Sequence, residues 1–172
     1  MTGEQLMIEL SPTVESVLAA NIMAALIARG DTVAVAESLT GGLVAAALTS
    51  VPGSSAAFRG GVVAYASDLK VALLGVDAAL LAREGAVHAD VAMEMARGVA
   101  AKLGATYGLA TTGVAGPAPQ DGHPIGEVHI AVVGPGGPVV ELLDLSSVGD
   151  RAAIRVATVE AALALLGQVA AR

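Results

Sequence analysis

A short apolar run that leads into a polar turn, residues 33–43, is the feature that most restricts how this chain can fold. It reads Val-Ala-Val-Ala-Glu-Ser-Leu-Thr-Gly-Gly-Leu, which predicts a buried strand, then Glu37 and Ser38, then a Gly-Gly step into a helix. A serine at such a junction is accessible to a ligand, and the free N–H groups of the first helical turn favour a nucleophile or a phosphate beside it. Alternatively, Ser38 or Thr40 caps the helix, and Glu37 is a helix-terminal carboxylate.

Strand and helix patterns alternate along the rest of the chain. Apolar runs bounded by Gly, Pro or polar residues predict strands at about 32–36, 62–65, 107–112, 127–133 and 139–145. Helical spacing of apolar residues predicts helices at about 12–29, 40–50, 68–74, 89–103 and 151–169. This alternation is typical of an α/β domain. The Gly-Pro turn at 134–138 predicts that the last two strands form an antiparallel hairpin, at about 127–145, appended to the sheet.

The length of the chain fits one domain. We expect a single domain across residues 1–172, in which 1–11 form an N-terminal extension and Ser11 caps the first helix. Because 55% of the residues are hydrophobic but only 2% are aromatic, the core must consist of closely packed small aliphatic side chains. The apolar stretch Ser16–Ala28 is too short to cross a bilayer, and the uncharged run from Ser38 to Phe58 is interrupted by turn-forming residues. These features predict a cytoplasmic domain that does not contact a membrane.

Charge and composition exclude several classes of site. The formal net charge is −7, and the nine Lys and Arg residues are dispersed, whereas nucleic-acid backbones need clustered cations. No cysteine is present, which excludes disulfides and thiolate chemistry. His88, His123 and His129 lack the spacing of a metal-binding motif. We therefore expect no nucleic-acid partner, no metal and no cofactor, and we expect His129 to face away from the core.

Polar residues recur where the predicted strands end. Ser38, Tyr65 and Thr112 each follow or close an apolar run, and ligands of open α/β sheets bind at the carboxyl ends of the strands. These three side chains are therefore expected to line one crevice. Lys70 follows Tyr65 in the next helix, and burial in that crevice would lower its proton affinity and make it a possible base. Taken singly, a strand tyrosine usually packs in the core, and a helix lysine is usually solvated.

Two further segments are candidates for ligand binding. The Gly- and Pro-rich loop 116–126 is long enough to be a binding loop or a rim, although it could be only a surface connection. The last helix begins after Asp150, a good N-cap, and Arg151 in its first turn opposes the helix dipole. A cation in that position suggests an anionic partner, either a phosphate or an internal carboxylate.

Several motifs in unbroken order resemble the CinA C-terminal domain family over about residues 12 to 170. The motifs are Ala36-Glu-Ser-Leu-Thr-Gly-Gly42, Pro52-Gly-Ser-Ser55, Gly61-Val-Val-Ala-Tyr65 with Lys70, Leu74-Gly-Val76, Gly85-Ala-Val87, Thr112-Gly-Val-Ala-Gly-Pro117, Pro124-Ile-Gly126 and Gly149-Asp-Arg151. The resemblance implies a three-layer α/β/α sandwich with a mostly parallel sheet. Stand-alone members of the family hydrolyse the carboxamide of nicotinamide mononucleotide to nicotinic acid mononucleotide and ammonia, by a metal-free serine-lysine amidase mechanism in pyridine nucleotide recycling.

The resemblance also implies roles for single residues. The family's serine, tyrosine and lysine fall on Ser38, Tyr65 and Lys70, its hydroxyl residue before Gly-x-Ala-Gly falls on Thr112, and its Gly-Asp-Arg arginine falls on Arg151. Two positions depart from the family pattern. The usual cysteine after the serine is Leu39 here, and the usual Tyr-Ser-Asn is Tyr65-Ala-Ser.

These roles give a mechanism of acyl transfer. We expect neutral Lys70 to take the proton of Ser38, whose oxygen attacks the amide carbon, and water to hydrolyse the acyl-enzyme. Backbone N–H groups of Thr40, Gly41 and Gly42 are expected to hold the oxyanion. The remaining substrate contacts involve Tyr65, which relays a proton or fixes Lys70, Thr112 with Gly113, which orients the amide, and Arg151, which binds the phosphate.

A different class of function stays open at this point. The changes at Leu39 and Ala66 favour a nucleotide-binding module of the same fold that has lost the amidase rate. Family members associate, so we also expect a homo-oligomer.

Overall fold

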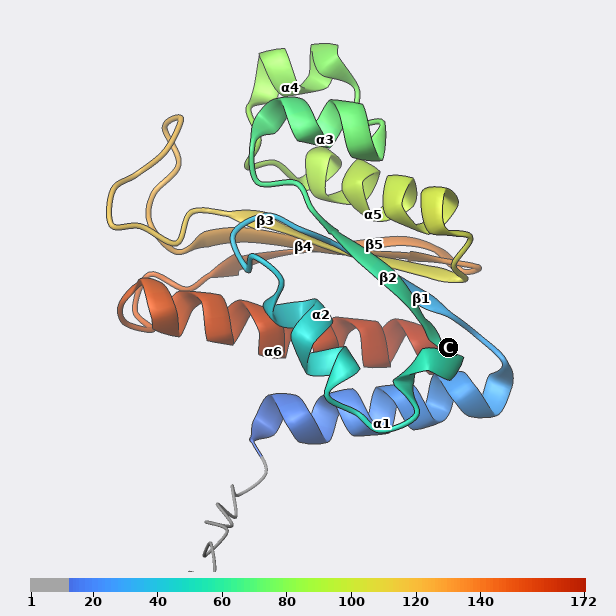
Figure 1. Ribbon diagram of the computed structural model, residues 1–172. Coiled ribbons are helices and arrows are strands. Elements are labelled where there is room, and N and C mark those ends of the chain that lie inside the picture. Colours follow the sequence, from blue (N-terminus) through green and yellow to red (C-terminus); the bar gives the residue numbers. More distant parts are fainter. Residues whose placement is uncertain (1–12) are drawn as a thin grey trace, which may run out of the picture.

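The computed structural model describes residues 13–172 as a five-stranded mixed sheet between two layers of helices (Figure 1). In chain order its elements are α1 Val14–Arg29, β1 Val33–Glu37, α2 Leu43–Thr49, a short 3₁₀ turn Ser54–Ala56, β2 Phe58–Val63, α3 Ser67–Leu74, α4 Ala78–Glu84, α5 Ala89–Leu103, β3 Tyr107–Gly113, β4 Glu127–Gly134, β5 Gly137–Asp144 and α6 Arg151–Ala170. The predicted α/β/α sandwich is confirmed.

The strand order is β2-β1-β3-β4-β5. Strands β2, β1 and β3 are parallel to one another, with β1 in the middle. Strand β4 runs antiparallel to β3 and forms the predicted hairpin with β5 at the edge of the sheet. The sheet is therefore parallel on one side and antiparallel on the other, and the carboxyl ends of β2, β1 and β3 lie side by side.

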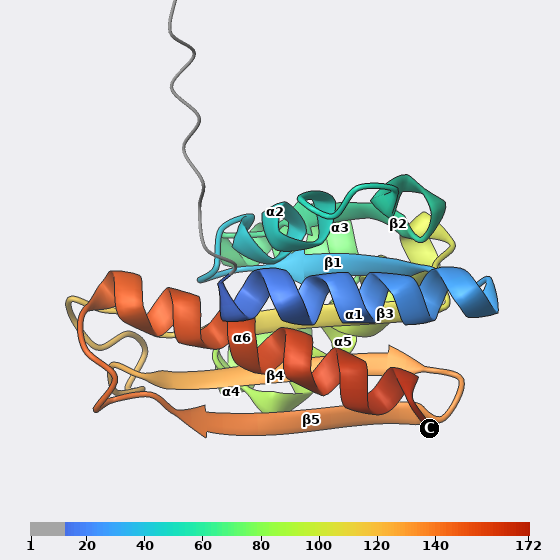
Figure 2. The ribbon, with the colours of Figure 1, turned by 90° about the horizontal axis from the view of Figure 1, so that it is seen from below.

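Successive side chains of β1 point to opposite faces of the sheet, and each face is covered by its own layer of helices. Val33 and Val35 point into a core formed with α1, α2 and α6, whereas Ala34 and Ala36 point into a second core formed mainly with α3, α4 and α5. Figures 1 and 2 show these two groups of helices on opposite faces of the sheet. Small residues allow α5 to approach closely. A Cβ on Gly108 of β3 would lie only 1.9 Å from the Ala96 carbonyl oxygen of α5.

Helix α6 is the long helix of the first layer. It is 20 residues long, and an 18-residue window within it has a mean hydropathy of 1.5, which would satisfy the length and composition of a membrane span, a property that buried helices of globular domains share. Here α6 contacts β4, β3 and α1, and nine of its residues are buried. It is thus a core helix that covers the middle of the sheet, and its first turn lies at the end of the sheet where β1 and β3 finish.

Four elements differ from the sequence prediction. Strand β2 begins at Phe58 rather than at Val62, because Phe58, Gly60 and Gly61 pair with β1 across a register shift. Helix α4 was not predicted, although Asp77 caps it by accepting from the Ala79 N–H. Helix α2 begins at Leu43 rather than near Thr40. The first helix starts at Val14 with Thr13 as its cap, and the predicted cap Ser11 lies outside the described residues.

Candidate active site

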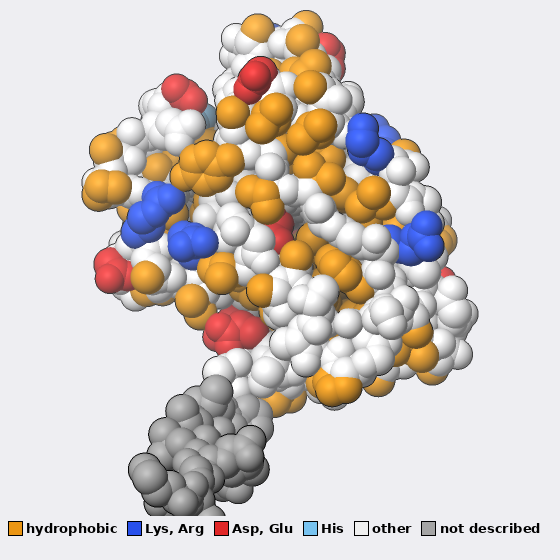
Figure 3. Space-filling view, viewed as in Figure 1, with side chains coloured by type: hydrophobic (Ala, Val, Ile, Leu, Met, Phe, Trp, Pro, Cys, Tyr) orange, Lys and Arg blue, Asp and Glu red, His pale blue; other side chains and the backbone are white. Residues whose placement is uncertain are grey.

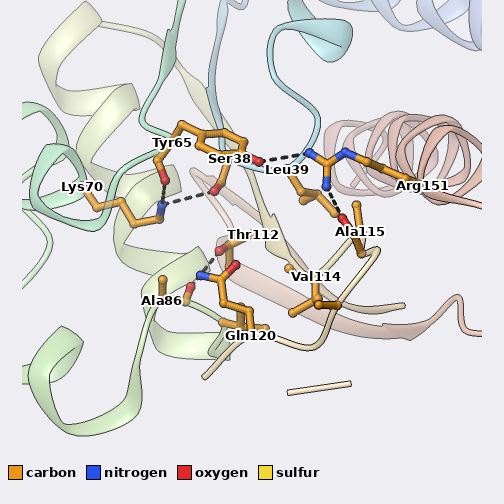
Figure 4. A pocket seen from close by; sticks show the side chains of 14 residues that line it. Ser38, Leu39, Tyr65, Lys70, Ala86, Thr112, Val114, Ala115, Gln120 and Arg151 are labelled. Atoms are coloured by element: carbon orange, nitrogen blue, oxygen red, sulfur yellow. Dashed lines mark hydrogen bonds between the residues drawn. The ribbon is translucent and has the colours of Figure 1, made fainter. Parts of the chain in front are cut away.

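A pocket opens at the carboxyl ends of the three parallel strands, beside the loop that follows β3 (Figure 4). Its polar lining residues are Ser38, Tyr65, Lys70, Thr112, Gln120 and Arg151, and the chain from Gly113 to Gly116 forms one wall. Ser38 follows β1, Tyr65 follows β2, and Thr112 is the penultimate residue of β3. The structure therefore brings together the three strand-end residues that the sequence predicted to share a crevice, and it adds Lys70 and Arg151 to them.

The turn after β1 holds Ser38 in a fixed backbone position. The Ser38 N–H donates to the Thr111 carbonyl of the neighbouring strand, and the Ser38 carbonyl accepts from the Gly41 N–H. Glu37 is 1% exposed, and its carboxylate accepts the N–H groups of Gly42, Val44 and Ala45 at 2.8 to 3.2 Å. Glu37 thus provides the helix-terminal carboxylate for α2, and no side-chain cap from Ser38 or Thr40 is present. Ser38 is left free to face the pocket.

Lys70 contacts Ser38 directly. Its Nζ atom lies 3.2 Å from Ser38 Oγ, 2.8 Å from the Ala64 carbonyl oxygen and 3.3 Å from the Tyr65 carbonyl oxygen. The side chain is 1% exposed, and burial lowers the pKa of Lys70 from 10.5 to about 8. A neutral amine donates two N–H groups and carries one lone pair. The two carbonyls can accept both N–H groups, which leaves the lone pair to accept the Ser38 hydroxyl proton.

Tyr65 makes two hydrogen bonds at the pocket, one through its main-chain carbonyl and one through its side-chain hydroxyl. Its carbonyl oxygen accepts from Lys70, but its hydroxyl accepts from Arg151 Nη2 at 3.0 Å, and the side chain is 59% exposed. The side-chain hydroxyl is therefore bonded to Arg151 and not to Lys70, as Figure 4 shows. Lys70 is fixed by the main chain of Tyr65, so the predicted proton relay through the hydroxyl has no hydrogen bond to support it.

Arg151 lies at the mouth of the pocket, in the first turn of α6. Besides Tyr65, it donates to the Gly116 carbonyl oxygen. Its internal partners are thus a neutral hydroxyl and a carbonyl, and among residues 13–172 no carboxylate forms an ion pair with it. Of the two partners that the sequence left open, an internal carboxylate is not found within residues 13–172.

Thr112 lies across the pocket from the Ser38 turn. It is 1% exposed, and its hydroxyl donates to the Ala86 carbonyl oxygen at 2.7 Å. Because that bond uses its only proton, the Thr112 oxygen faces the pocket as an acceptor. The next residue, Gly113, has no room for a side chain, since a Cβ there would lie 2.6 Å from the Glu127 carbonyl oxygen of β4.

Two of the three predicted oxyanion donors, the N–H groups of Gly41 and Gly42, already have acceptors within the protein. The Gly41 N–H donates to the Ser38 carbonyl, and the Gly42 N–H donates to Glu37, so neither is free to bind an oxyanion. The Thr40 hydroxyl is bonded to Thr111 at 2.8 Å and is fully buried. Within residues 13–172 the N–H groups of Leu39 and Thr40 have no hydrogen-bond acceptor, which makes them the candidate donors.

Two residues at the site were missed in the sequence. Arg155 donates from Nε to the Leu39 carbonyl at 2.9 Å and from Nη2 to the Thr40 carbonyl at 2.8 Å. Its position, four residues after Arg151 and so on the same face of α6, was an available signal.

The second missed residue is Gln120, from the 116–126 loop, which lies beside Thr112 in Figure 4. Gly116, Ala118 and Gln120 all line the pocket, so this loop forms its rim. The loop is closed by a tight turn in which the backbones of Gln120 and His123 bond each other.

The orientation predicted for His129 is wrong. His129 pairs with Thr112 across β3 and β4 and is 8% exposed, packed near His88 with ring centroids 6.4 Å apart. Burial lowers its pKa, although nearby Glu127 acts in the opposite direction. Among residues 13–172, no group of three or more His, Cys, Asp or Glu side chains could hold a metal ion.

One cationic side chain, Arg151, lies at the mouth of the pocket, and Arg155 lies one turn further along α6, although the whole chain is acidic. Figure 3 shows Lys and Arg side chains between the loop after β3 and the start of α6, the part of the helix that carries Arg151 and Arg155. A local positive field at the entrance of a cleft attracts anionic ligands. The site thus combines a serine-lysine pair in its depth with a guanidinium at its edge.

Comparison with known proteins gives a consistent result. The family model of the CinA C-terminal domain matches residues 15–170. A CinA-like protein of Frankia casuarinae is 54% identical over 150 residues, which are 87% of this chain and 34% of that protein. A CinA-like protein of Gloeobacter violaceus is 47% identical over 153 residues, 88% of this chain and 36% of that protein. The chain therefore spans about a third of the length of these relatives.

Solved structures match nearly the whole chain. The competence/damage inducible protein CihA of Agrobacterium tumefaciens has a TM-score of 0.89 and 36% identity, and the match covers 96% of this chain and 100% of that one. A CinA superfamily protein of Escherichia coli has a TM-score of 0.87 and 31% identity, with 94% of each chain covered. These names identify a family and do not specify a reaction.

Proposed function

We propose that this chain, which belongs to the CinA C-terminal domain family, hydrolyses the carboxamide of nicotinamide mononucleotide to nicotinic acid mononucleotide and ammonia. The substrate is that of the stand-alone amidases of this family, whose motifs the chain resembles. The observation that carries the proposal is the contact between Lys70 Nζ and Ser38 Oγ at 3.2 Å in a buried environment. A nucleophile next to a base of lowered pKa is the arrangement that covalent amide hydrolysis needs.

The reaction begins with proton transfer from Ser38 to neutral Lys70. The Ser38 oxygen attacks the amide carbon, and the carbonyl oxygen of the substrate becomes an oxyanion. Protonated Lys70 then supplies a proton to the leaving nitrogen, the carbon–nitrogen bond breaks and ammonia departs. Water attacks the resulting ester, Lys70 accepts a proton from it, and the acid leaves as Ser38 regains its proton.

The oxyanion is held by the main chain of the turn that carries Ser38. The N–H groups of Leu39 and Thr40 directly follow the nucleophile and lack internal acceptors among the described residues. A preorganised donor of this kind typically contributes about 3 to 4 kcal/mol to transition-state stabilisation. Leu39 itself is 4% exposed and lines the pocket next to Ser38, so its apolar side chain forms part of the wall beside the nucleophile.

The carboxamide end of the substrate needs hydrogen-bond acceptors and its phosphate end needs a cation, and the pocket offers acceptors near Thr112 and a cation at Arg151. The Thr112 oxygen and the Ala86 carbonyl lie together, and acceptors of this kind suit the NH₂ of a primary carboxamide. Arg151 is the candidate for the phosphate at the other end, because guanidinium groups bind phosphate through paired hydrogen bonds. The substrate would then extend from the buried serine to the cationic rim.

The test is direct. Purified protein is incubated with nicotinamide mononucleotide, and ammonia and nicotinic acid mononucleotide are quantified together in equimolar yield, while mass spectrometry of acid-quenched protein detects a nicotinoyl-nucleotide ester on the peptide that contains Ser38. Equimolar products support the proposal. Binding of the mononucleotide without ammonia release contradicts it and supports the alternative, a nucleotide-binding module, for which the replacement of the family's cysteine by Leu39 is the specific observation.

A further inference from the structure

We propose that Arg155 is a positioning residue for the oxyanion site, acting through the main chain of Leu39 and Thr40. Arg155 lies in the second turn of α6 and is half-buried. Its Nε and Nη2 atoms bond two consecutive carbonyls of the Ser38 turn, at 2.9 and 2.8 Å. Hydrogen bonds from a charged donor to a carbonyl are shorter and stronger than those from a neutral donor. The planar fork of the guanidinium therefore sets the orientation of two adjacent peptide planes.

Because the peptide unit is planar, the orientation of each carbonyl also fixes the direction of the N–H group of the following residue. In a trans peptide the C=O and N–H groups point in opposite directions, so a Leu39 carbonyl aimed at Arg155 directs the Thr40 N–H away from α6. That N–H is one of the two in the turn that have no acceptor among residues 13–172. A cation bonded to the carbonyl also polarises the peptide, and hydrogen bonds in a chain strengthen one another. Arg155 should thus make the Thr40 N–H a better-aimed and stronger donor.

Other contacts hold the start of α2 and the helix that carries Arg155, so Arg155 affects mainly the turn between them. On the other side of the turn, Glu37 and the Gly41 N–H to Ser38 carbonyl bond fix the start of α2. Gly41 leaves space for the guanidinium, since a Cβ there would lie 3.3 Å from Arg155 Nη2. Neighbouring Ile154 and Thr158 are fully buried in α6, so the helix has its own core contacts. The loss of Arg155 should therefore release the turn without unfolding the helix.

The inference rests on the proposed acyl transfer at Ser38, but it has a consequence that does not require amide hydrolysis. A boronic acid forms a tetrahedral adduct with a nucleophilic serine, and one of its oxygens occupies the position of the oxyanion. Pyridine-3-boronic acid carries the aromatic ring that the proposal assigns to the substrate. Its affinity therefore reports the oxyanion site whether or not the protein releases ammonia from the mononucleotide.

The experiment compares Arg155→Met and Arg155→Lys with the wild-type protein and with Arg59→Met. Arg59 is a matched control, because it also donates to a main-chain carbonyl, that of Leu103 at 3.1 Å, at the opposite end of β2 from the site. For Arg155→Met we expect kcat to fall by about 10-fold to 100-fold with KM changed by less than about twofold, and the Kd of pyridine-3-boronic acid to rise by about tenfold. Arg155→Lys should be intermediate, because an ammonium cannot reproduce the fork.

The possible results distinguish the proposed deamidase activity from the proposed role of Arg155. If the wild type releases no ammonia but Arg155→Met weakens pyridine-3-boronic acid binding while Arg59→Met does not, the deamidase proposal fails and the role of Arg155 stands. If Arg155→Met is folded by circular dichroism and retains wild-type kcat and wild-type boronate affinity, the role of Arg155 is refuted. A wild-type protein that does not bind the boronic acid also refutes it. If Arg155→Met does not fold, the comparison uses Arg155→Lys, for which unchanged values count against the inference.

Discussion

Lys70 Nζ lies 3.2 Å from Ser38 Oγ, and the same nitrogen lies within hydrogen-bond distance of the main-chain carbonyls of Ala64 and Tyr65. These three oxygens are all the partners that Lys70 has within residues 13–172. When the amine is charged, its three N–H groups occupy all three oxygens. When the amine is neutral, the two carbonyls take its two N–H groups and Ser38 faces its lone pair. The protonation state of Lys70 therefore decides whether Ser38 is activated.

The first prediction concerns pH. Burial lowers the pKa of Lys70 to about 8, so the amine is mostly charged below that pH and cannot accept a proton. We expect kcat/KM to increase about tenfold per pH unit on the acidic side and to reach a plateau above the pKa of Lys70. Initial rates of ammonia release across about pH 6 to pH 10 test this. A rate that is constant through this range, or one that falls as Lys70 loses its proton, would contradict the role of Lys70 as the base.

The second prediction separates the two functions of Tyr65. Tyr65→Phe removes the hydroxyl that accepts from Arg151 but keeps the carbonyl that accepts from Lys70. We expect KM for the mononucleotide to rise by about threefold to tenfold and kcat to stay within about twofold of wild type, because in the proposed site the hydroxyl only orients Arg151, the residue to which we assign the phosphate. Steady-state kinetics measure both values. A fall in kcat of more than about tenfold would instead indicate a proton relay through the hydroxyl.

The third prediction concerns the phosphate. Arg151→Met should raise KM for nicotinamide mononucleotide by about 10-fold to 100-fold, the usual worth of a charged hydrogen bond to phosphate. The same variant should hardly change kcat/KM for nicotinamide riboside, which lacks the phosphate. Arg83→Met is the control, since Arg83 is an exposed arginine paired with Glu84 outside the pocket. Equal losses with both substrates would show that Arg151 acts on the fold of the rim and not on the phosphate.

The fourth prediction concerns stability. Glu37 is a buried carboxylate that accepts three N–H groups, and Glu37→Gln would turn an NH₂ group toward at least one of those donors. We expect a loss of about 1 to 3 kcal/mol in the free energy of unfolding. Glu94→Gln is the control, because Glu94 accepts one N–H, that of Asp77, at an exposed site, and it should cost about 1 kcal/mol or less. Urea denaturation compares the two variants with wild type, and equal losses would contradict the special role of Glu37.

Much of this fold follows from the sequence. The alternation of Val and Ala in β1 predicts a strand that is buried on both faces, and in the structure its two sets of side chains enter different cores. Because β1 lies between β2 and β3, the residues after these strands had to meet at one edge. The meeting of Ser38, Tyr65 and Thr112 was therefore predictable from strand order and strand ends alone.

Other features depend on contacts between distant segments, which local pattern does not contain. Gly41 and Gly42 read as free helix N-terminal donors, but the Glu37 carboxylate and the Ser38 carbonyl already occupy their N–H groups. His129 read as an outward strand residue, because the sequence does not indicate that α5 and His88 cover that face. Arg155 was missed because its partners are two main-chain carbonyls more than a hundred residues away.

The central claim is that Ser38 and Lys70 together hydrolyse the amide without a metal ion. The most direct measurement is ammonia release from nicotinamide mononucleotide, in buffer that contains a chelator, by the wild type and by Ser38→Ala and Lys70→Ala. The controls are Ser50→Ala and Lys102→Ala, which alter exposed residues outside the pocket. We predict chelator-resistant turnover in the wild type and both controls, and a loss of at least about 10³-fold in each site variant. A folded Ser38→Ala protein that turns over at the wild-type rate would contradict the covalent mechanism.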